Sequence, residues 1–183
     1  MNITLVKAVN KLKAAEKIII TSHVIPDGDA VGSSLALSKI LRALGKDVRV
    51  FIDDSIRRTL QTLPGFETIE RPKVDEKLDA DLVVILDTQP DRIGQVRKAA
   101  EGIPILNIDH HVTNEGNDVE LYLEENAAAT CEIIFKFAKR LGVPIDNDMA
   151  VCLYTGIATD TGFFNYANTR PSTLRVAAEL LEA

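Results

Sequence analysis

One short stretch near the N-terminus, HVIPDGDA at residues 23 to 30, combines a histidine with two carboxylates. His23, Asp27 and Asp29 follow the apolar run KIIIT, so they are predicted to lie where a buried strand ends. Burying like charges so close together is costly unless a positive charge lies between them. Because side chains of an extended chain alternate with period two, Asp27 and Asp29 are expected to point the same way and to bind neighbouring cations. The turn at Pro26 would bring the His23 imidazole to the cation of Asp27.

Two later apolar runs end in the same kinds of residue. LVVIL is followed by Asp87, and ILNI by Asp109, His110 and His111, so all three histidines of the chain lie at predicted strand ends. Ligands of open α/β sheets bind beyond the carboxyl ends of the strands. The two oxygens of Asp87 suit a bridge between two ions. Neighbouring histidines on a strand end are expected to diverge, so that one binds metal and the other faces substrate, while Asp109 fixes a histidine tautomer from behind.

Each motif taken alone has a simpler explanation. DGD is most often a turn or a helix cap, and Asp29 can cap the helix that begins AVGSS. Asp87 before Thr88 is also typical of a cap, and Asp160 in GIATDTGF can be a polar residue at a helix end. DGDAVGSS lacks the spacing of a P-loop or of a dinucleotide-binding motif, and Gly32 is predicted to let its helix approach the sheet. The four motifs together favour a metal site.

The elements that must position these residues alternate between strands and helices. Strands are predicted over residues 17–21, 48–52, 82–86 and 103–108, and helices within 1–17, over 29–44 and near 91–102. Residues 53–79 predict a short helix at 56–63 and an edge strand at 67–70, and the remainder predicts helices over 129–142, 147–164 and 171–183, the last with Ser172 as N-cap. Continuously apolar strands are typical of sheets that are covered on both faces. The predicted class is therefore α/β, a mainly parallel doubly wound sheet with helices on both faces and a helical C-terminal third.

Length and composition favour one soluble domain over residues 1–183. Apolar residues make up 46% of the chain and charged residues 26%, and no apolar run approaches the roughly 20 residues of a membrane span. The N-terminal stretch lacks the pattern of a signal peptide, so a cytoplasmic location without membrane partners is expected. Cys131 and Cys152 lie in apolar helical patterns and are expected to be buried thiols. A net charge of −6 argues against binding of long duplex nucleic acid.

Four segments together resemble the successive motifs of the DHH phosphoesterase family. They are HVIPDGDAVGS, VVILDTQPDRIG, NIDHHVTN and GIATDTGFF, in the family's order and spread through nearly the whole chain. The segments ATCEIIFKFAKRLG and NTRPSTLRVAAELL are similar to connecting segments of its oligoribonuclease and 3'-phosphoadenosine-5'-phosphate phosphatase branch, also called nanoRNase. By this resemblance, residues 1–183 are the catalytic domain, and the family's C-terminal substrate-binding domain is absent from the chain.

The resemblance also implies a role for each candidate residue. One metal ion would be bound by His23 and Asp27, the other by Asp29, His110 and Asp160, with Asp87 bridging the two. His111 would contact the scissile phosphate or assist proton transfer, supported by Asp109. Oxygen and imidazole ligands without thiolate suit manganese or magnesium, and the family usually prefers manganese. Two such ions, about 3.5 to 4 Å apart, would activate a water and stabilise charge on the phosphate.

Three functions remain open at this stage. The leading hypothesis is a manganese-dependent phosphoesterase for short RNA or DNA oligonucleotides, linear dinucleotides or adenosine 3',5'-bisphosphate, with a homodimer as one option for its assembly. A pyrophosphatase or exopolyphosphatase would use the same metal ligands. A non-catalytic module that binds metal or nucleotide is the third reading. Few aromatic residues, 5% of the chain with no tryptophan, offer no obvious stacking platform for bases and slightly favour small phosphates.

Overall fold

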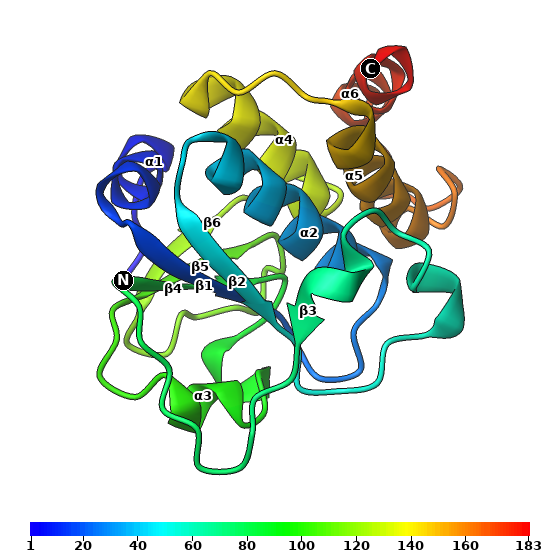
Figure 1. Cartoon of the computed structure of the whole chain (residues 1–183). Helices are drawn as coiled ribbons and strands as arrows, with labels where there is room; N and C mark the ends of the chain where they lie inside the picture. The colour runs from blue at the N-terminus through cyan, green and yellow to red at the C-terminus, as the bar shows by residue number, and fades with distance from the viewer.

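A single six-stranded sheet organises the chain in this computed structural model, which describes residues Met1 to Ala183 (Figure 1). All its strand pairs are parallel, in the order β3-β2-β1-β4-β5-β6. The strands are β1 (Lys17–Thr21), β2 (Asp47–Phe51), β3 (Ile69–Glu70), β4 (Leu82–Leu86), β5 (Ile105–Asp109) and β6 (Glu120–Leu123). The helices are α1 (Leu5–Ala14), α2 (Gly28–Ala43), α3 (Val96–Ala99), α4 (Thr130–Leu141), α5 (Asn147–Asp160) and α6 (Pro171–Glu182). The strand order reverses between β1 and β4, which is the switch point of a doubly wound sheet.

The central strands are continuously apolar because their alternate side chains enter two different cores. Ile18 and Ile20 of β1 belong to a core cluster of 39 buried residues, whereas Ile19 belongs to a second cluster of 9. Figure 1 shows α2 and α4 on one face of the sheet and the short α3 on the other. The expected cover on both faces is confirmed, with most of the apolar burial on the side of α2.

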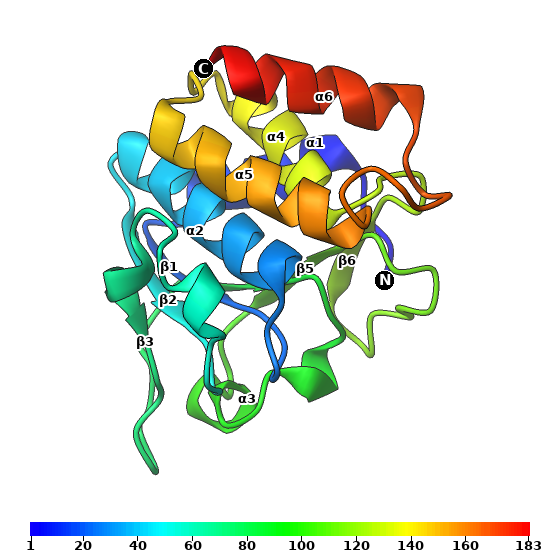
Figure 2. The same ribbon diagram turned by 90° about the vertical axis from the view of Figure 1, so that its right-hand side faces the viewer.

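Helices α2 and α5 pack closely where glycines remove the side chains between them. A Cβ on Gly32 would lie 2.4 Å from the Cys152 carbonyl oxygen of α5, and one on Gly156 would lie 2.2 Å from Cys131 Sγ. Gly32 therefore accommodates α5 and not the sheet, so that prediction is wrong. Figure 2 shows α5 alongside α2, with α6 outermost. None of these helices has both the length and the apolar character that a membrane span requires.

Several boundaries differ from the predicted ones. Helix α2 begins at Gly28 with Asp27 as N-cap, and α6 begins at Pro171 with Arg170 as N-cap, so Asp29 and Ser172 are not caps. Proline suits the first helical position because the amide hydrogen that it lacks has no helical partner there.

Differences also occur where the chain is irregular. The expected helices at 56–63 and 91–102 shrink to 3-10 turns, Arg58–Leu60 and Pro90–Arg92, and to the four residues of α3. The helix predicted over 147–164 ends at Asp160, because Gly162, Phe163 and Phe164 adopt left-handed backbone. Strand β6 was not predicted.

Candidate metal centre

Three adjacent strands bring the candidate residues to one edge of the sheet. Strand β4 pairs with β1 on one side and with β5 on the other. His23 follows β1, Asp87 follows β4, and His110 follows β5. Because the strands are parallel, their carboxyl ends lie together beside the switch point, where ligands of such sheets bind.

The first group of ligand atoms comes from His23, Asp27 and Asp87, which lie close enough together to hold one ion. His23 Nε2 is 3.9 Å from Asp27 Oδ1 and 3.6 Å from Asp87 Oδ2. His23 Nδ1 lies 2.8 Å from the Val24 carbonyl oxygen. A carbonyl only accepts hydrogen bonds, so Nδ1 carries the hydrogen and the lone pair of a neutral ring is at Nε2. That nitrogen faces both carboxylates.

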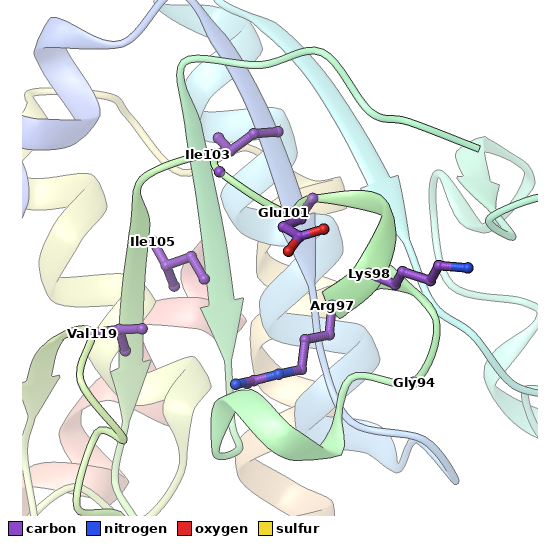
Figure 3. A pocket seen from close by; sticks show the side chains of 9 residues that line it. Gly94, Arg97, Lys98, Glu101, Ile103, Ile105 and Val119 are labelled. Atoms are coloured by element: carbon purple, nitrogen blue, oxygen red, sulfur yellow. The ribbon is translucent and has the colours of Figure 1, made fainter. Parts of the chain in front are cut away.

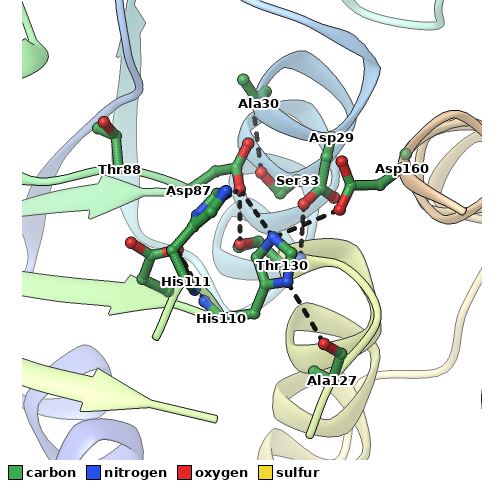
Figure 4. Close-up of polar contacts among 12 residues, drawn as sticks. Asp29, Ala30, Ser33, Asp87, Thr88, His110, His111, Ala127, Thr130 and Asp160 are labelled. Carbon is green, nitrogen blue, oxygen red and sulfur yellow. Dashed lines mark hydrogen bonds and ion pairs between the residues drawn. The ribbon is translucent and has the colours of Figure 1, made fainter. Parts of the chain in front are cut away.

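The second group comes from Asp29, His110 and Asp160. His110 Nε2 lies 3.4 Å from Asp160 Oδ2, and His110 Nδ1 donates to the Ala127 carbonyl oxygen at 3.3 Å. Nε2 of His110 is buried and has no hydrogen-bond partner. Figure 4 shows this ring between Asp87 and the pair Asp29 and Asp160. The buried, unpartnered nitrogen therefore faces a set of carboxylate oxygens.

Asp87 connects the two groups. Its Oδ2 faces His23 Nε2 at 3.6 Å, and its Oδ1 faces His110 Nε2 at 3.5 Å. The residue is 3% exposed and has a φ of +61°, in the left-handed region. Thr130 Oγ1 donates a hydrogen bond of 3.1 Å to Asp87 Oδ1. Strained backbone of this kind persists only where the surroundings enforce it, and here it places one carboxylate between two imidazoles.

Asp29 is held by the start of α4. Its Oδ2 accepts from the Thr130 amide at 2.6 Å and its Oδ1 from the Cys131 amide at 2.8 Å. Helix α4 has no side-chain cap of its own, because Ala129 occupies the N-cap position. The helix dipole and two amides therefore stabilise the buried carboxylate. Thr130 was not predicted as a site residue, although a helix that begins AAAT without a local cap indicates that a distant residue supplies the cap.

Asp27 and Asp29 do not follow the expected extended geometry. Asp27 is the N-cap of α2, accepting from the amides of Asp29 and Ala30 at 3.0 Å each, and Asp29 lies in the first helical turn. The helix begins one residue before Asp29, so the period-two argument does not apply. The two carboxylates nonetheless lie in different groups, as neighbouring ion sites require.

His110 and His111 do not diverge as predicted. Their ring centroids are 4.3 Å apart, and His111 Nδ1 lies 3.7 Å from Asp87 Oδ1. They differ in the nitrogen that they present, because His111 Nδ1 binds Asp109 Oδ1 at 2.8 Å. The His111 side chain is 50% exposed, whereas that of His110 is 11% exposed. His110 thus faces the carboxylates, and His111 faces solvent.

A buried amide network holds Asp109. Its Oδ1 accepts from the amides of His110 and His111, and its Oδ2 accepts from Asn114 Nδ2 at 2.6 Å. Asn114 Nδ2 also reaches Asn107 Oδ1 at 2.8 Å, and Asn107 Nδ2 donates to the Thr88 carbonyl oxygen at 2.8 Å. The two asparagines were not predicted, although Asn107 is the one polar residue inside the run ILNI. With both oxygens occupied, Asp109 supports the histidines from behind.

The carboxylates of the site repel one another, and the positively charged imidazolium rings that face them offset part of this repulsion. Burial, together with the charges of Asp87 and Asp160, raises the pKa of Asp29 well above its ordinary value. Burial raises the pKa of Asp160 to about 6. Burial opposes ionisation of Asp87, but the facing imidazoles of His110 and His23 outweigh it and lower the pKa of Asp87.

The neighbouring carboxylates raise the pKa values of the His110 and His111 imidazoles. Burial disfavours the charged ring of His110, yet Asp87 and Asp29 raise its pKa to about 9. The hydrogen bond to Asp109 is the main cause that raises the pKa of His111. Protons therefore supply, in the metal-free protein, the positive charge that the carboxylates demand.

The residues fit divalent cations. In their neutral forms two histidines present Nε2 lone pairs, one of them on a buried nitrogen without a partner, and four carboxylates complete two adjacent groups. Hard cations such as manganese and magnesium take oxygen donors, and manganese also accepts imidazole. Cys131 and Cys152 are free, buried thiols, as expected, and belong to neither group.

A separate cavity lies beside α3, away from the candidate ligands. It has a volume of about 530 Å³ and is lined by α3 and the neighbouring strand edge, including Arg97, Ile105 and Val119 (Figure 3). None of the candidate ligands lines it.

Comparison with known proteins agrees with this geometry. The model of the DHH family, N-terminal domain, matches residues 17–157. The bifunctional oligoribonuclease and PAP phosphatase NrnA of Thermus thermophilus is 42% identical over 171 residues, which are 93% of this chain and 51% of that protein. A probable manganese-dependent inorganic pyrophosphatase of Streptococcus agalactiae is 28% identical over 91% of this chain and 55% of its own length.

A solved structure shares the fold over the whole chain. The exopolyphosphatase-related protein from Bacteroides fragilis matches with a TM-score of 0.88 at 30% identity, covering 98% of this chain and 58% of that one. The chain spans about half the length of the curated relatives that it matches. From the matched motif order, the sheet and the two ligand groups, the chain belongs to the DHH family, and its residues 17–157 correspond to the family's N-terminal domain.

Proposed function

We propose that this domain is a two-metal phosphoesterase that hydrolyses short oligonucleotides, linear dinucleotides or adenosine 3',5'-bisphosphate. The position of Asp87 supports this most directly, because its two oxygens face the histidines of two separate ligand groups. A carboxylate so placed is suited to bridge two cations. The name of the Thermus thermophilus relative, which is an oligoribonuclease and PAP phosphatase, supports the choice of substrates.

Each residue has a role in this proposal. His23, Asp27 and Asp87 would hold one cation, and Asp29, His110 and Asp160 the other, with Asp87 shared. Manganese is the preferred ion because the donor set combines carboxylate oxygens with imidazole. When bound, such a pair of cations supplies an activated water and positive charge for the phosphate oxygens.

His111 is the proposed catalytic residue on the solvent side. Its Nδ1 is held by Asp109, so its Nε2 is free to meet a phosphate oxygen. The hydrogen bond to Asp109 raises the pKa of His111 and favours the imidazolium, which donates a hydrogen bond or a proton at Nε2. Asp109 is a positioning residue, since its own oxygens are occupied by amides and by Asn114.

A pyrophosphatase is the second candidate, favoured by the similarity to the Streptococcus agalactiae protein. The same ligands would serve it, so only substrates can separate the two. Release of phosphate and nucleotide would be measured for adenosine 3',5'-bisphosphate, a dinucleotide, a five-nucleotide RNA and pyrophosphate, each with manganese and with chelator. Manganese-dependent turnover of the nucleotides alone is the expected result. Turnover of pyrophosphate alone would favour the second candidate.

Two variants test whether the hydrolytic activity belongs to this site. Asp87→Ala should abolish binding of both cations and all hydrolysis, whereas Glu101→Gln, an acidic position lining the distant cavity, should leave both unchanged. Hydrolysis surviving in Asp87→Ala would exclude the bridging role. No turnover of any substrate, with manganese bound, would indicate either that hydrolysis needs the part of the relatives that this chain does not span or that the domain is a non-catalytic module.

A further inference from the structure

The loop between β2 and the turn Arg58–Leu60 is fixed against the candidate metal centre. Asp54 Oδ2 accepts from the Ile25 amide at 2.8 Å, which ties this loop to the one that carries His23 and Asp27. Asp53 Oδ2 accepts from the Gln95 amide at 2.6 Å. Arg57 lies three residues after Asp54, directly before the turn Arg58–Leu60.

Arg57 lines a cavity of about 240 Å³ together with Asp27 and Asp160. These aspartates belong to different ligand groups, so the cavity adjoins both. Thr59 and Thr159 also line it, Leu60 is its one apolar side chain, and Arg57 its one basic side chain.

The guanidinium of Arg57 is free to take a ligand. Arg57 is exposed and is the N-cap of its 3-10 turn without a side-chain hydrogen bond. No ion pair forms between it and Asp27 or Asp160, although all three line the same cavity. An exposed arginine is ordinarily a solvated surface residue, but this one lies beside acids whose charge bound cations would neutralise. A planar fork of donors next to neutralised carboxylates favours a phosphate or carboxylate ligand.

Size and polarity decide which part of a substrate fits. Pockets for whole ligands usually measure about 300 to 1,000 Å³ and have mainly apolar linings. This cavity is smaller, and six of its seven lining residues are not hydrophobic. A phosphate with its waters suits it better than a nucleobase, which needs an apolar or aromatic surface.

We infer that Arg57 and this cavity form a subsite for a second, non-scissile phosphate of the substrate. Resting on the proposed function, this inference narrows the substrate class to nucleotides that carry two separate phosphate groups, such as a nucleoside 3',5'-bisphosphate or a 5'-phosphorylated dinucleotide. The scissile phosphate would lie at the two ligand groups, and the other would accept hydrogen bonds from the Arg57 guanidinium.

The test compares adenosine 3',5'-bisphosphate with the adenosine monophosphate that keeps only the scissile phosphate, 3' or 5' as product analysis shows. Binding of each is measured by isothermal titration calorimetry with calcium in place of manganese, so that the ligand stays intact, and hydrolysis is measured separately with manganese by chromatography. Arg57→Ala is compared with Arg58→Ala, which removes the same charge from the next residue but not from the cavity lining. Pyrophosphate is titrated in parallel.

The expected result is a preference for the bisphosphate that depends on Arg57. The Arg57→Ala change should reduce the affinity ratio of bisphosphate to monophosphate by about 10-fold to 100-fold, as for loss of a hydrogen bond to a charged group. Arg58→Ala should keep the wild-type ratio, and both variants should bind manganese as the wild type does. Loss of the preference in both variants would indicate a general charge effect and overturn the assignment.

Other outcomes separate this inference from the proposed function. Hydrolysis of the bisphosphate with an unchanged ratio in Arg57→Ala would overturn the subsite and leave the enzyme proposal intact. Arg57-dependent binding without hydrolysis would support the subsite and contradict the enzyme proposal. If wild type does not bind the bisphosphate, or if only pyrophosphate binding depends on Arg57, the assignment to nucleotides with two phosphates is wrong.

Discussion

Replacing Asp160 by asparagine should have opposite effects in the presence and absence of metal. Burial raises the pKa of Asp160 from 3.8 to about 6 in the metal-free protein. Because one pKa unit corresponds to about 1.4 kcal/mol, ionised Asp160 costs the folded state up to about 3 kcal/mol. The side chain is 27% exposed, so solvent screening reduces the expected cost to about 1 to 2 kcal/mol. Asp160→Asn should stabilise the metal-free protein by that amount at pH 8.

The sign of the pH dependence follows from the same shift. The folded-state pKa lies above the unfolded value, so Asp160 carries no penalty below about pH 4 and its full penalty above about pH 6. The stability difference between wild type and Asp160→Asn should therefore increase across this window. With saturating manganese the order should reverse, because wild type gains binding free energy that the variant lacks; at 100 times Kd, one site contributes about 2.7 kcal/mol.

Urea unfolding in chelator and in manganese, from pH 4.5 to 8, measures both effects. The reasoning fails if Asp160→Asn is no more stable than wild type at pH 8 in chelator. It also fails if manganese stabilises the two proteins equally, since Asp160 would then bind no cation.

Four further predictions concern single features of the structure. Manganese binding at pH 7 should release protons, because the raised pKa of His110, about 9, keeps it protonated without metal; calorimetry in buffers of different ionisation enthalpy counts them. Asp109→Asn should lower the pKa of His111, which NMR titration of the metal-free protein records, and an unchanged pKa would exclude the positioning role. Gly156→Ala should destabilise the fold by about 1 to 3 kcal/mol in urea, since its Cβ would lie 2.2 Å from Cys131 Sγ and 2.8 Å from Asp29 Oδ1; Cys131→Ala in the same chain should restore part of the loss. Phe163→Gly should raise Tm, because relief of left-handed strain, about 1 to 2 kcal/mol, exceeds the entropy cost of glycine, about 0.5 to 1 kcal/mol; a lower Tm would mean that the exposed ring packs usefully.

The central strands could be predicted because their sequences depend on burial alone. KIIIT and LVVIL coincide with β1 and β4, since both faces of each strand are covered and every position but the first lysine is apolar or buried. Strand β6 could not be found in this way. It is a four-residue strand at the edge of the sheet, it is partly exposed, and its sequence ELYL alternates too briefly to give a signal. The N-terminal residues extend the sheet beyond it, as Ile3 donates to the Leu121 carbonyl oxygen.

Some residues of the candidate site could likewise be predicted from the sequence, and others could not. Carboxylates and histidines after apolar runs could be recognised because parallel strands place their ends together. The grouping of Asp27 and Asp29 followed from helix geometry that the sequence analysis did not anticipate. Thr130 reaches Asp87 through a contact between distant segments, for which the missing side-chain cap of α4 is the one local sign. Asn114 binds Asp109 from five residues further along the chain, and its residue type alone does not mark this contact.

The strand order has a further consequence for the way the chain folds and unfolds. The six proposed ligands lie between positions 23 and 160, on segments that meet only when β1, β4, β5 and the end of α5 are in their native places. A cation bound there would therefore find its complete set of ligands late, after the slow search for long-range parallel pairing. It would add little to the speed of folding. It would instead slow unfolding, because the bonds to the ligand set must break before the unfolding transition state is reached. Bound manganese would therefore lengthen the lifetime of the folded protein more than it would raise the folding rate.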